Sequence, residues 1–307
     1  MSDQIIDILV GEENNGLRID KFLSIQDIDL SRSYIQKLMK EESVIVNSVP
    51  VKASYKVTTG DMVVITVPEP TEMKIEPENI PLDIVYEDMD IIIINKAKGM
   101  VVHPAAGHYS GTIVNALLYH CKEELSGING VLRPGIVHRI DMNTTGLIVV
   151  CKNDKAHAFI AEQLKEHSIT RRYNALVYNS FKEEEGTVEA SIARHPIDRK
   201  KMAITTHGGK RAVTHYKVLE NFSSKYAYIE CTLETGRTHQ IRVHMASIHH
   251  PLLGDDVYGV AKDPFKLEGQ ALHARVLGFI HPTTKEYIEF EAPLPEYFTG
   301  LISKLRK

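Results

Sequence analysis

The sequence predicts an α+β protein with a central mixed, largely antiparallel β-sheet, flanking helices and a small α+β module in front. Strand-like runs outnumber helical runs after residue 82, and the helices fall between them without the regular alternation of a doubly wound sheet. A segment with four prolines and no apolar period separates residues 1–68 from residues 82–307. Residues 69–81 are therefore expected to be an extended linker between two domains.

The N-terminal module is expected to contain two short helices and a few strands. Apolar residues recur at helical spacing from Leu17 to Leu23 and again over residues 34–39. Ser31 and Ser33 precede the second run and are candidates for its N-cap. Two runs rich in β-branched side chains predict strands, Val44–Val46 and Met62–Val67.

The larger domain is expected to be mostly strand. The predicted strands are residues 90–96, 100–104, 135–141, 144–152, 168–179, 210–222, 226–236, 272–281 and 286–293, with turns at Lys98–Gly99 and Pro282–Lys285. The predicted helices are residues 112–121, residues 156–167 with Asn153 or Asp154 as the cap, and residues 238–250.

The composition is that of an ordinary globular protein, with 307 residues, 43% of them hydrophobic, and a formal net charge of −4. No run approaches the roughly 18 apolar residues that cross a bilayer. The N-terminus lacks the basic start and apolar core of a secretion signal, so we expect a cytoplasmic protein. Cys121, Cys151 and Cys231 stand singly in apolar runs and are expected to be reduced core residues.

Positive charge is concentrated in one segment. Residues 1–70 carry a net charge of −4 and residues 71–307 are neutral, yet residues 194–217 hold seven Lys or Arg against a single acid, Asp198. Such a face can bind phosphates. The ordinary alternative is a basic strand edge that prevents aggregation, and the charge alone favours this alternative.

Asp141 stands at the most informative corner of the sequence, between the predicted strands 135–141 and 144–152. A carboxylate at a strand end is held by rigid backbone while its tip can face a cleft, which suits catalysis. A turn-capping role next to Asn143 and Thr144 is the ordinary alternative, and a single Asp in a loop favours this alternative.

Four stretches of the larger domain together resemble the RluA-type pseudouridine synthases. They are HRIDMNTTGL, RRYNALV, ETGRTHQIRVHMASIHHPLLGDDVYG and LHARVLGFIHP, and the resemblance spans roughly residues 80–295. The domain order, PAAGHYSGTIVNALLYH and GGKRAVTHYKV are most similar to the RluD-like subgroup. Residues 16–68 are similar to the ribosomal-protein-S-four-like RNA-binding module. The resemblance implies the pseudouridine synthase fold and isomerisation of uridine in large-subunit ribosomal RNA.

By this resemblance Asp141 is the catalytic carboxylate, Arg242 is its ionic partner, Tyr173 stacks on the target uracil and Arg139 fills the space of the extruded base. An opposite charge within about 4 to 6 Å favours the ionised carboxylate. The further expected RNA contacts are His138, Thr145, Arg237, His239 and Gln240 near the corner, Arg199, Lys200 and Lys201 in the basic segment, and Arg18, Lys21, Arg32, Ser33 and Lys37 in the N-terminal module.

Pseudouridylation involves no redox change and no net consumption of water, so we expect no cofactor, no metal and no nucleotide. The expected partner is large-subunit ribosomal RNA or an assembling large subunit, bound by a monomer. A non-catalytic RNA-binding or ribosome-assembly protein of the same fold is the alternative. A histidine-dependent metal hydrolase is disfavoured, because His239 and His244 are five residues apart rather than four.

Overall fold

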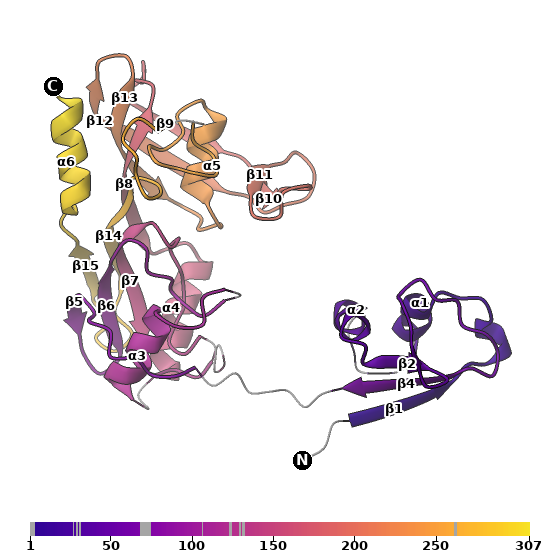
Figure 1. Ribbon diagram of the computed structural model, residues 1–307. Helices are drawn as coiled ribbons and strands as arrows, with labels where there is room; N and C mark the ends of the chain where they lie inside the picture. Colours follow the sequence, from indigo (N-terminus) through magenta and orange to yellow (C-terminus); the bar gives the residue numbers. More distant parts are fainter. Residues whose placement is uncertain are drawn as a thin grey trace. The chain divides into compact units, whose positions relative to one another are not determined.

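The computed structural model describes residues 4–26, 28, 30, 32–67, 75–105, 107–122, 125–128, 130, 133–260 and 263–307, except for the side chains of Arg32 and Ser33. The chain divides into two compact units, residues 1–73 and 74–307 (Figure 1). No helix among the described residues has the length and apolar character needed to cross a bilayer.

The first unit is a four-stranded antiparallel sheet with two short helices packed on one face. Its strands lie in the order β1 (Gln4–Leu9), β4 (Met62–Val67), β2 (Val44–Val46) and β3 (Val49–Pro50). The helices are α1 (Ile19–Ser24) and α2 (Arg32–Lys40), and a short 3-10 turn, η1 (Glu12–Asn14), precedes them. Phe22 and Leu38 of the two helices and Ile65 of the sheet are fully buried in one core.

The two predicted helices and two predicted strands of this unit are confirmed, but the edge strand β1 was not predicted. Its side chains are mostly exposed, and its pairing with β4 is made across more than fifty residues, so no local pattern marks it. Ser33 lies inside α2 rather than at its N-cap, which corrects that prediction. Ser31 lies outside the described residues.

The second unit is built on one large mixed sheet, and eight of its strands form a continuous path from β5 to β9 (Figure 1). The order is β5 (Ile84–Glu87), β6 (Ile91–Lys96), β7 (Thr145–Cys151), β14 (Leu272–Ile280), β8 (Thr170–Tyr178), β13 (Tyr226–Leu233), β12 (Val213–Phe222) and β9 (Glu185–Glu189), with β15 (Tyr287–Glu291) paired to β14. Only β7 and β14 pair in parallel among the described strands, which confirms the mixed, largely antiparallel sheet.

The helices of this unit cover the sheet, and they confirm three of the predicted segments. They are α3 (Ile113–Cys121), α4 (Asp154–Lys165), α5 (Gln240–Ser247) and α6 (Glu296–Leu305), of which α6 was not predicted. Asn153 caps α4 by accepting a hydrogen bond from the backbone N–H of Ala156. A separate hairpin of β10 (Ile192–Arg194) and β11 (Met202–Ile204) projects from the sheet, and its loop and second strand lie in the basic segment (Figure 1).

Strand β6 is buried on both faces, which explains its run of four isoleucines. Ile91 and Ile93 belong to the core that includes Ile160 of α4. Ile92 and Ile94 belong to the core under α3. The three cysteines are buried and free, as the sequence predicts.

Two predicted strands are wrong, residues 100–104 and residues 135–141. The second segment runs beside β7 but makes only one backbone hydrogen bond to Cys151 and an isolated bridge at Ile136. The next hydrogen bond goes to a side chain instead of to a backbone carbonyl, because the backbone N–H of Val149 donates to His138 Nε2 at 3.1 Å. The polypeptide that leads to Asp141 is therefore a loop held against the sheet.

Candidate active site

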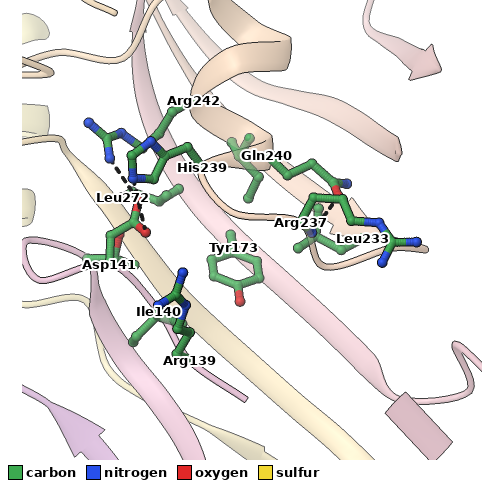
Figure 2. Close-up of a pocket in the computed structure, with 12 residues that line it drawn as sticks. Arg139, Ile140, Asp141, Tyr173, Leu233, Arg237, His239, Gln240, Arg242 and Leu272 are labelled. Atoms are coloured by element: carbon green, nitrogen blue, oxygen red, sulfur yellow. Dashed lines mark hydrogen bonds and ion pairs between the residues drawn. The ribbon is translucent and has the colours of Figure 1, made fainter. Parts of the chain in front are cut away.

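Asp141 lines three adjoining hollows of the second unit. Figure 2 shows the smallest of them. The backbone N–H of Thr144 donates to the Asp141 carbonyl at 3.0 Å and closes the turn that leads into β7. The Asp141 side chain keeps 25% of its surface exposed, so it remains accessible to a ligand. Apolar side chains line the smallest hollow beside it, namely Ile140, Leu233, Ile241 and Leu272.

Gly146 fixes the position of the corner relative to the sheet. Its φ angle is +105°, and a Cβ there would overlap the backbone carbonyl oxygen of Ala274 on β14. Only glycine tolerates both conditions. The close approach of β7 and β14 therefore places Asp141 directly at the end of the parallel pair.

Arg242 joins Asp141 to a second, deeply buried carboxylate. Its Nη1 donates to Asp141 Oδ2 at 2.9 Å, while Nε and Nη2 donate to the two oxygens of Asp255 at 2.7 and 2.8 Å. Burial opposes the charged form, but the hydrogen bonds and charges of Asp255 and Asp141 raise the pKa of Arg242 above its ordinary value. A guanidinium with this geometry is a fixed cation beside the Asp141 carboxylate.

Asp255 holds the guanidinium in place, and the sequence reasoning did not identify it. Its carboxylate is buried, and Oδ1 also accepts the backbone N–H groups of Val257 and Tyr258 at 3.0 Å each. Burial acts to raise the pKa of Asp255, but Arg242 and these N–H donors outweigh it and lower the pKa. Its position in the stretch ending GDDVYG, which resembles the family, was a signal in the sequence that could have found it.

Tyr173 faces the same hollow from strand β8 (Figure 2). Its ring is buried among core residues, and burial raises the pKa of its hydroxyl. The ring is therefore neutral at physiological pH and presents an aromatic surface close to Asp141. The structure thus brings together Asp141, Arg242 and Tyr173, which the sequence places far apart.

His239 and Tyr258 form a wall beside the ion pair of Asp141 and Arg242. His239 adopts a left-handed conformation at the start of α5, with a φ angle of 56°. Its Nε2 is 3.8 Å from Asp141 Oδ1, and its Nδ1 is 2.9 Å from the Tyr258 hydroxyl. The Tyr258 hydroxyl also accepts the backbone N–H of Met202 at 2.7 Å, and the ring covers the Arg242 guanidinium. This wall links the basic hairpin to the ion pair.

Lys96 holds the backbone around Asp141 in place, and the sequence reasoning did not identify this residue either. It is buried, and its Nζ donates to the carbonyl oxygens of Ala97, Met100 and Met142 at 2.8, 2.9 and 2.7 Å. Burial lowers the pKa of Lys96 to about 7, and the charge of Asp141 opposes this shift. Three acceptors match the three donors of an ammonium group. The lysine thereby fixes the loop that follows Asp141.

Comparison with known proteins identifies this arrangement. Residues 90–247 match the family described as RNA pseudouridylate synthase, and residues 17–63 match the S4 domain. The chain belongs to the RNA pseudouridylate synthase family. A relative from Bacillus subtilis, named as an uncharacterized RNA pseudouridine synthase, is 53% identical over 302 residues, which is 98% of this chain and 98% of the relative.

Further comparisons support membership of the pseudouridylate synthases. The ribosomal large subunit pseudouridine synthase D of Zymomonas mobilis is 46% identical over 299 residues, 94% of each chain. The solved structure of human RNA pseudouridylate synthase domain containing 1 covers 78% of this chain and 97% of its own, with a TM-score of 0.57 and 24% identity. This structural likeness shows the shared fold.

Two of the predicted RNA contacts of this synthase, Thr145 and Gln240, are buried, and a third, His138, is half-buried and bonded to the backbone. His138 accepts from the Val149 backbone, and burial together with the charge of Arg171 lowers its pKa to about 3. Thr145 is buried and its Oγ1 lies 2.9 Å from His273 Nδ1. Gln240 is buried and bonds to the backbone and hydroxyl groups around it. Thr145 and Gln240 thus support the site from within, and direct RNA contact by any of the three stays a prediction, since His138 and Gln240 line the hollows beside Asp141.

The other predicted contacts of the pseudouridylate synthase unit are at its surface. Arg139, Arg237 and His239 line the hollows beside Asp141. The basic residues Arg199, Lys200 and Lys201 lie in the loop between β10 and β11. They are thus placed on the hairpin whose strand β11 bonds to Tyr258.

In the first unit, Arg18 and Lys37 are exposed, but a nearby acid partly neutralises the charge of each. Arg18 Nε is 3.0 Å from Asp20 Oδ1, and Lys37 Nζ is 3.8 Å from Glu41 Oε1. Lys21 is exposed on α1. The side chains of Arg32 and Ser33 lie outside the described part of the chain.

Proposed function

We propose that this synthase isomerises specific uridines of large-subunit ribosomal RNA to pseudouridine, with Asp141 as the catalytic carboxylate. The observation that carries the proposal is the convergence of Asp141, Arg242 and Tyr173 on one hollow. Relatives named ribosomal large subunit pseudouridine synthase D, 45% and 46% identical to this chain, support this choice of RNA.

The reaction breaks the bond between the ribose anomeric carbon and a uracil nitrogen, turns the base and rejoins it through carbon 5. Asp141 must be ionised whether it attacks the sugar or removes a proton, and the Arg242 guanidinium 2.9 Å away favours that form. Tyr173 supplies a neutral ring on which the detached uracil can stack. The apolar lining keeps water from the intermediate.

Access to Asp141 requires that the target nucleotide leave its helical stack, at a cost of a few kcal/mol. Arg139 is exposed at the rim of all three hollows, where its side chain can occupy the space that the base vacates. The flipped uridine would then lie between this arginine and the ion pair.

The N-terminal residues 1–68 are proposed as the RNA-binding module, residues 69–81 as the linker and residues 82–307 as the catalytic domain. The match of residues 17–63 to the S4 domain supports this division. The module would add phosphate contacts that position the RNA without reading its sequence. The RNA partner is ribosomal RNA or an assembling large subunit, bound by one copy of the chain.

The proposal is tested with Asp141→Asn, which preserves shape and removes the charge. Turnover should fall by about 10²- to 10⁴-fold or more, while RNA affinity stays within a few fold of the wild-type value. Asp83→Asn, at an exposed position of the same unit, should keep normal turnover.

Chemical mapping of pseudouridine in ribosomal RNA from a deletion strain identifies the site. Modification should return with the wild-type gene but not with the Asp141→Asn gene. A complete modification map in the deletion strain would favour the non-catalytic RNA-binding protein instead.

A further inference from the structure

Arg171 on strand β8 is a buried cation that the mechanism above does not use. It retains 6% of its surface, and its Nη2 donates to the backbone carbonyl of Glu234 at 3.0 Å. Its Nε has no hydrogen-bond partner, and no carboxylate of the described residues lies within 4 Å of its guanidinium. A buried guanidinium without an anionic partner is costly, so this position calls for an explanation.

The guanidinium of Arg171 borders a hollow of about 270 Å³ beside the catalytic corner. Arg139 and Arg237 line the same hollow, and the only acid among its lining residues is Asp141, which is already paired with Arg242. The charge of Arg237 acts together with burial to lower the pKa of Arg171, so the two cations repel each other. An anion between them would relieve this repulsion.

The surrounding backbone is built to admit the guanidinium. Arg171 and Tyr173 are two residues apart on β8 and so share one face of the strand, while Arg172 points to the other face. A Cβ at Gly236 would overlap Nη1 of Arg171, so the guanidinium packs directly against this glycine. Arg237 is itself fixed, because its Nε donates to the carbonyl oxygen of Arg211 at 3.1 Å.

We infer that Arg171 and Arg237 form a phosphate subsite, which binds a phosphodiester group of the RNA next to the extruded uridine. The inference rests on the proposed function for its ligand, since RNA is the polyanion brought to Asp141. A phosphate matches the planar donor edge of a guanidinium, whereas a neutral base would leave the charges uncompensated. The subsite fixes the ribose relative to Asp141. Arg139 can then fill the space that the extruded base leaves in the helical stack.

The first experiment measures equilibrium binding of a single-stranded RNA of twelve uridines at several salt concentrations. Arg171→Gln should weaken binding roughly tenfold or more and reduce the slope of log affinity against log salt by about 0.7, the value for one lost phosphate contact. Arg172→Gln is the matched control, since it removes the same charge from the opposite face, where Arg172 pairs with Glu289. It should leave the slope unchanged.

Two further variants separate charge from packing. Arg171→Lys should retain most of the salt slope, whereas Gly236→Ala should lose it while keeping every charge, because the new methyl group displaces the guanidinium. Equal slopes for Arg171→Gln, Arg172→Gln and the wild type would overturn the subsite and leave Arg171 as a partner of the Glu234 carbonyl.

The second experiment uses the wild-type protein and thus holds even if Arg171→Gln does not fold. A ribosomal RNA fragment with a target uridine receives one neutral methylphosphonate at the linkage on either side of that uridine. One of the two should bind the wild-type protein roughly tenfold more weakly than the natural RNA does. No loss at either linkage would overturn the inference. Absence of pseudouridine in the wild-type reaction would instead refute the proposed function, while the salt slopes remain measurable.

Discussion

Replacing Asp255 with asparagine tests whether the buried carboxylate holds Arg242 beside Asp141. The side chain of Asp255 is fully buried and that of Arg242 is 5% exposed, so water cannot replace the lost charge. An asparagine has one acceptor oxygen, and its NH₂ group would face a guanidinium N–H that now donates to Oδ2 at 2.7 Å. Removing one partner of a buried ion pair costs about 3–5 kcal/mol.

Urea unfolding followed by circular dichroism measures this loss for Asp255→Asn. Asp256→Asn is the matched control, because the neighbouring carboxylate is 76% exposed and comes no closer than 3.9 Å to Arg242. It should change stability by no more than about 0.5 kcal/mol. Turnover should also fall for Asp255→Asn, since Arg242 loses the charge of this partner and at least one of its two hydrogen bonds to it. A loss of stability below about 1 kcal/mol with normal turnover would refute the reasoning.

The same variant has a defined pH dependence. The folded state lowers the pKa of Asp255 below its unfolded value of about 3.9, so the carboxylate binds fewer protons in the folded state. Its stabilising contribution is therefore complete above about pH 4 to 5 and is lost as the pH falls through the lowered pKa. The stability difference between wild type and Asp255→Asn should be constant from about pH 5 to 8 and shrink in acid.

Three other variants test the framework of the site. Lys96→Met removes the ammonium donor from three backbone carbonyls, of which that of Met142 keeps the Gly99 N–H, and should cost about 2–5 kcal/mol in urea unfolding, with reduced turnover. Tyr258→Phe keeps the ring over the guanidinium but orphans a backbone N–H of β11, which should cost about 1–3 kcal/mol by the same assay. Gly146→Ala forces a methyl group onto the Ala274 carbonyl and should lower stability by about 3 kcal/mol or more in thermal unfolding, whereas Gly300→Ala in α6, with open space around it, should be neutral or stabilising.

Local patterns predicted most elements of this fold because their cause is local. The runs that became β6, β7, β8, β13 and β14 are apolar and β-branched, and α3 and α4 begin at the polar caps Thr112 and Asn153. The missed elements lack such a cause. Strand β1 exposes most of its side chains and depends on β4 for its hydrogen bonds. The segment 135–141 is the opposite case, a strand that was predicted but does not form. It is apolar enough for a strand, but His138 accepts the hydrogen bond from Val149 that a backbone carbonyl would otherwise accept.

The site residues that sequence motifs identified, Asp141, Arg242 and Tyr173, meet in one hollow as expected. Motifs did not distinguish the residues that touch a ligand from those that support them. Thr145 and Gln240 lie within the motifs yet are buried, and only the burial of a side chain by distant elements decides this. Lys96 and Asp255 were missed for the same reason, because nothing in the local sequence shows that a charged side chain will be buried.

The sequence by itself determined the order of the elements, the family and the candidate for the catalytic carboxylate, because these depend on residue types at short spacings. Tertiary structure alone decided how that carboxylate is held. The bonds from Arg242 to Asp141 and from Lys96 to Met142 join residues 101 and 46 positions apart. Such contacts depend on the close approach of β7 and β14 and on the exclusion of water from the groups between them, neither of which is a property of any local stretch.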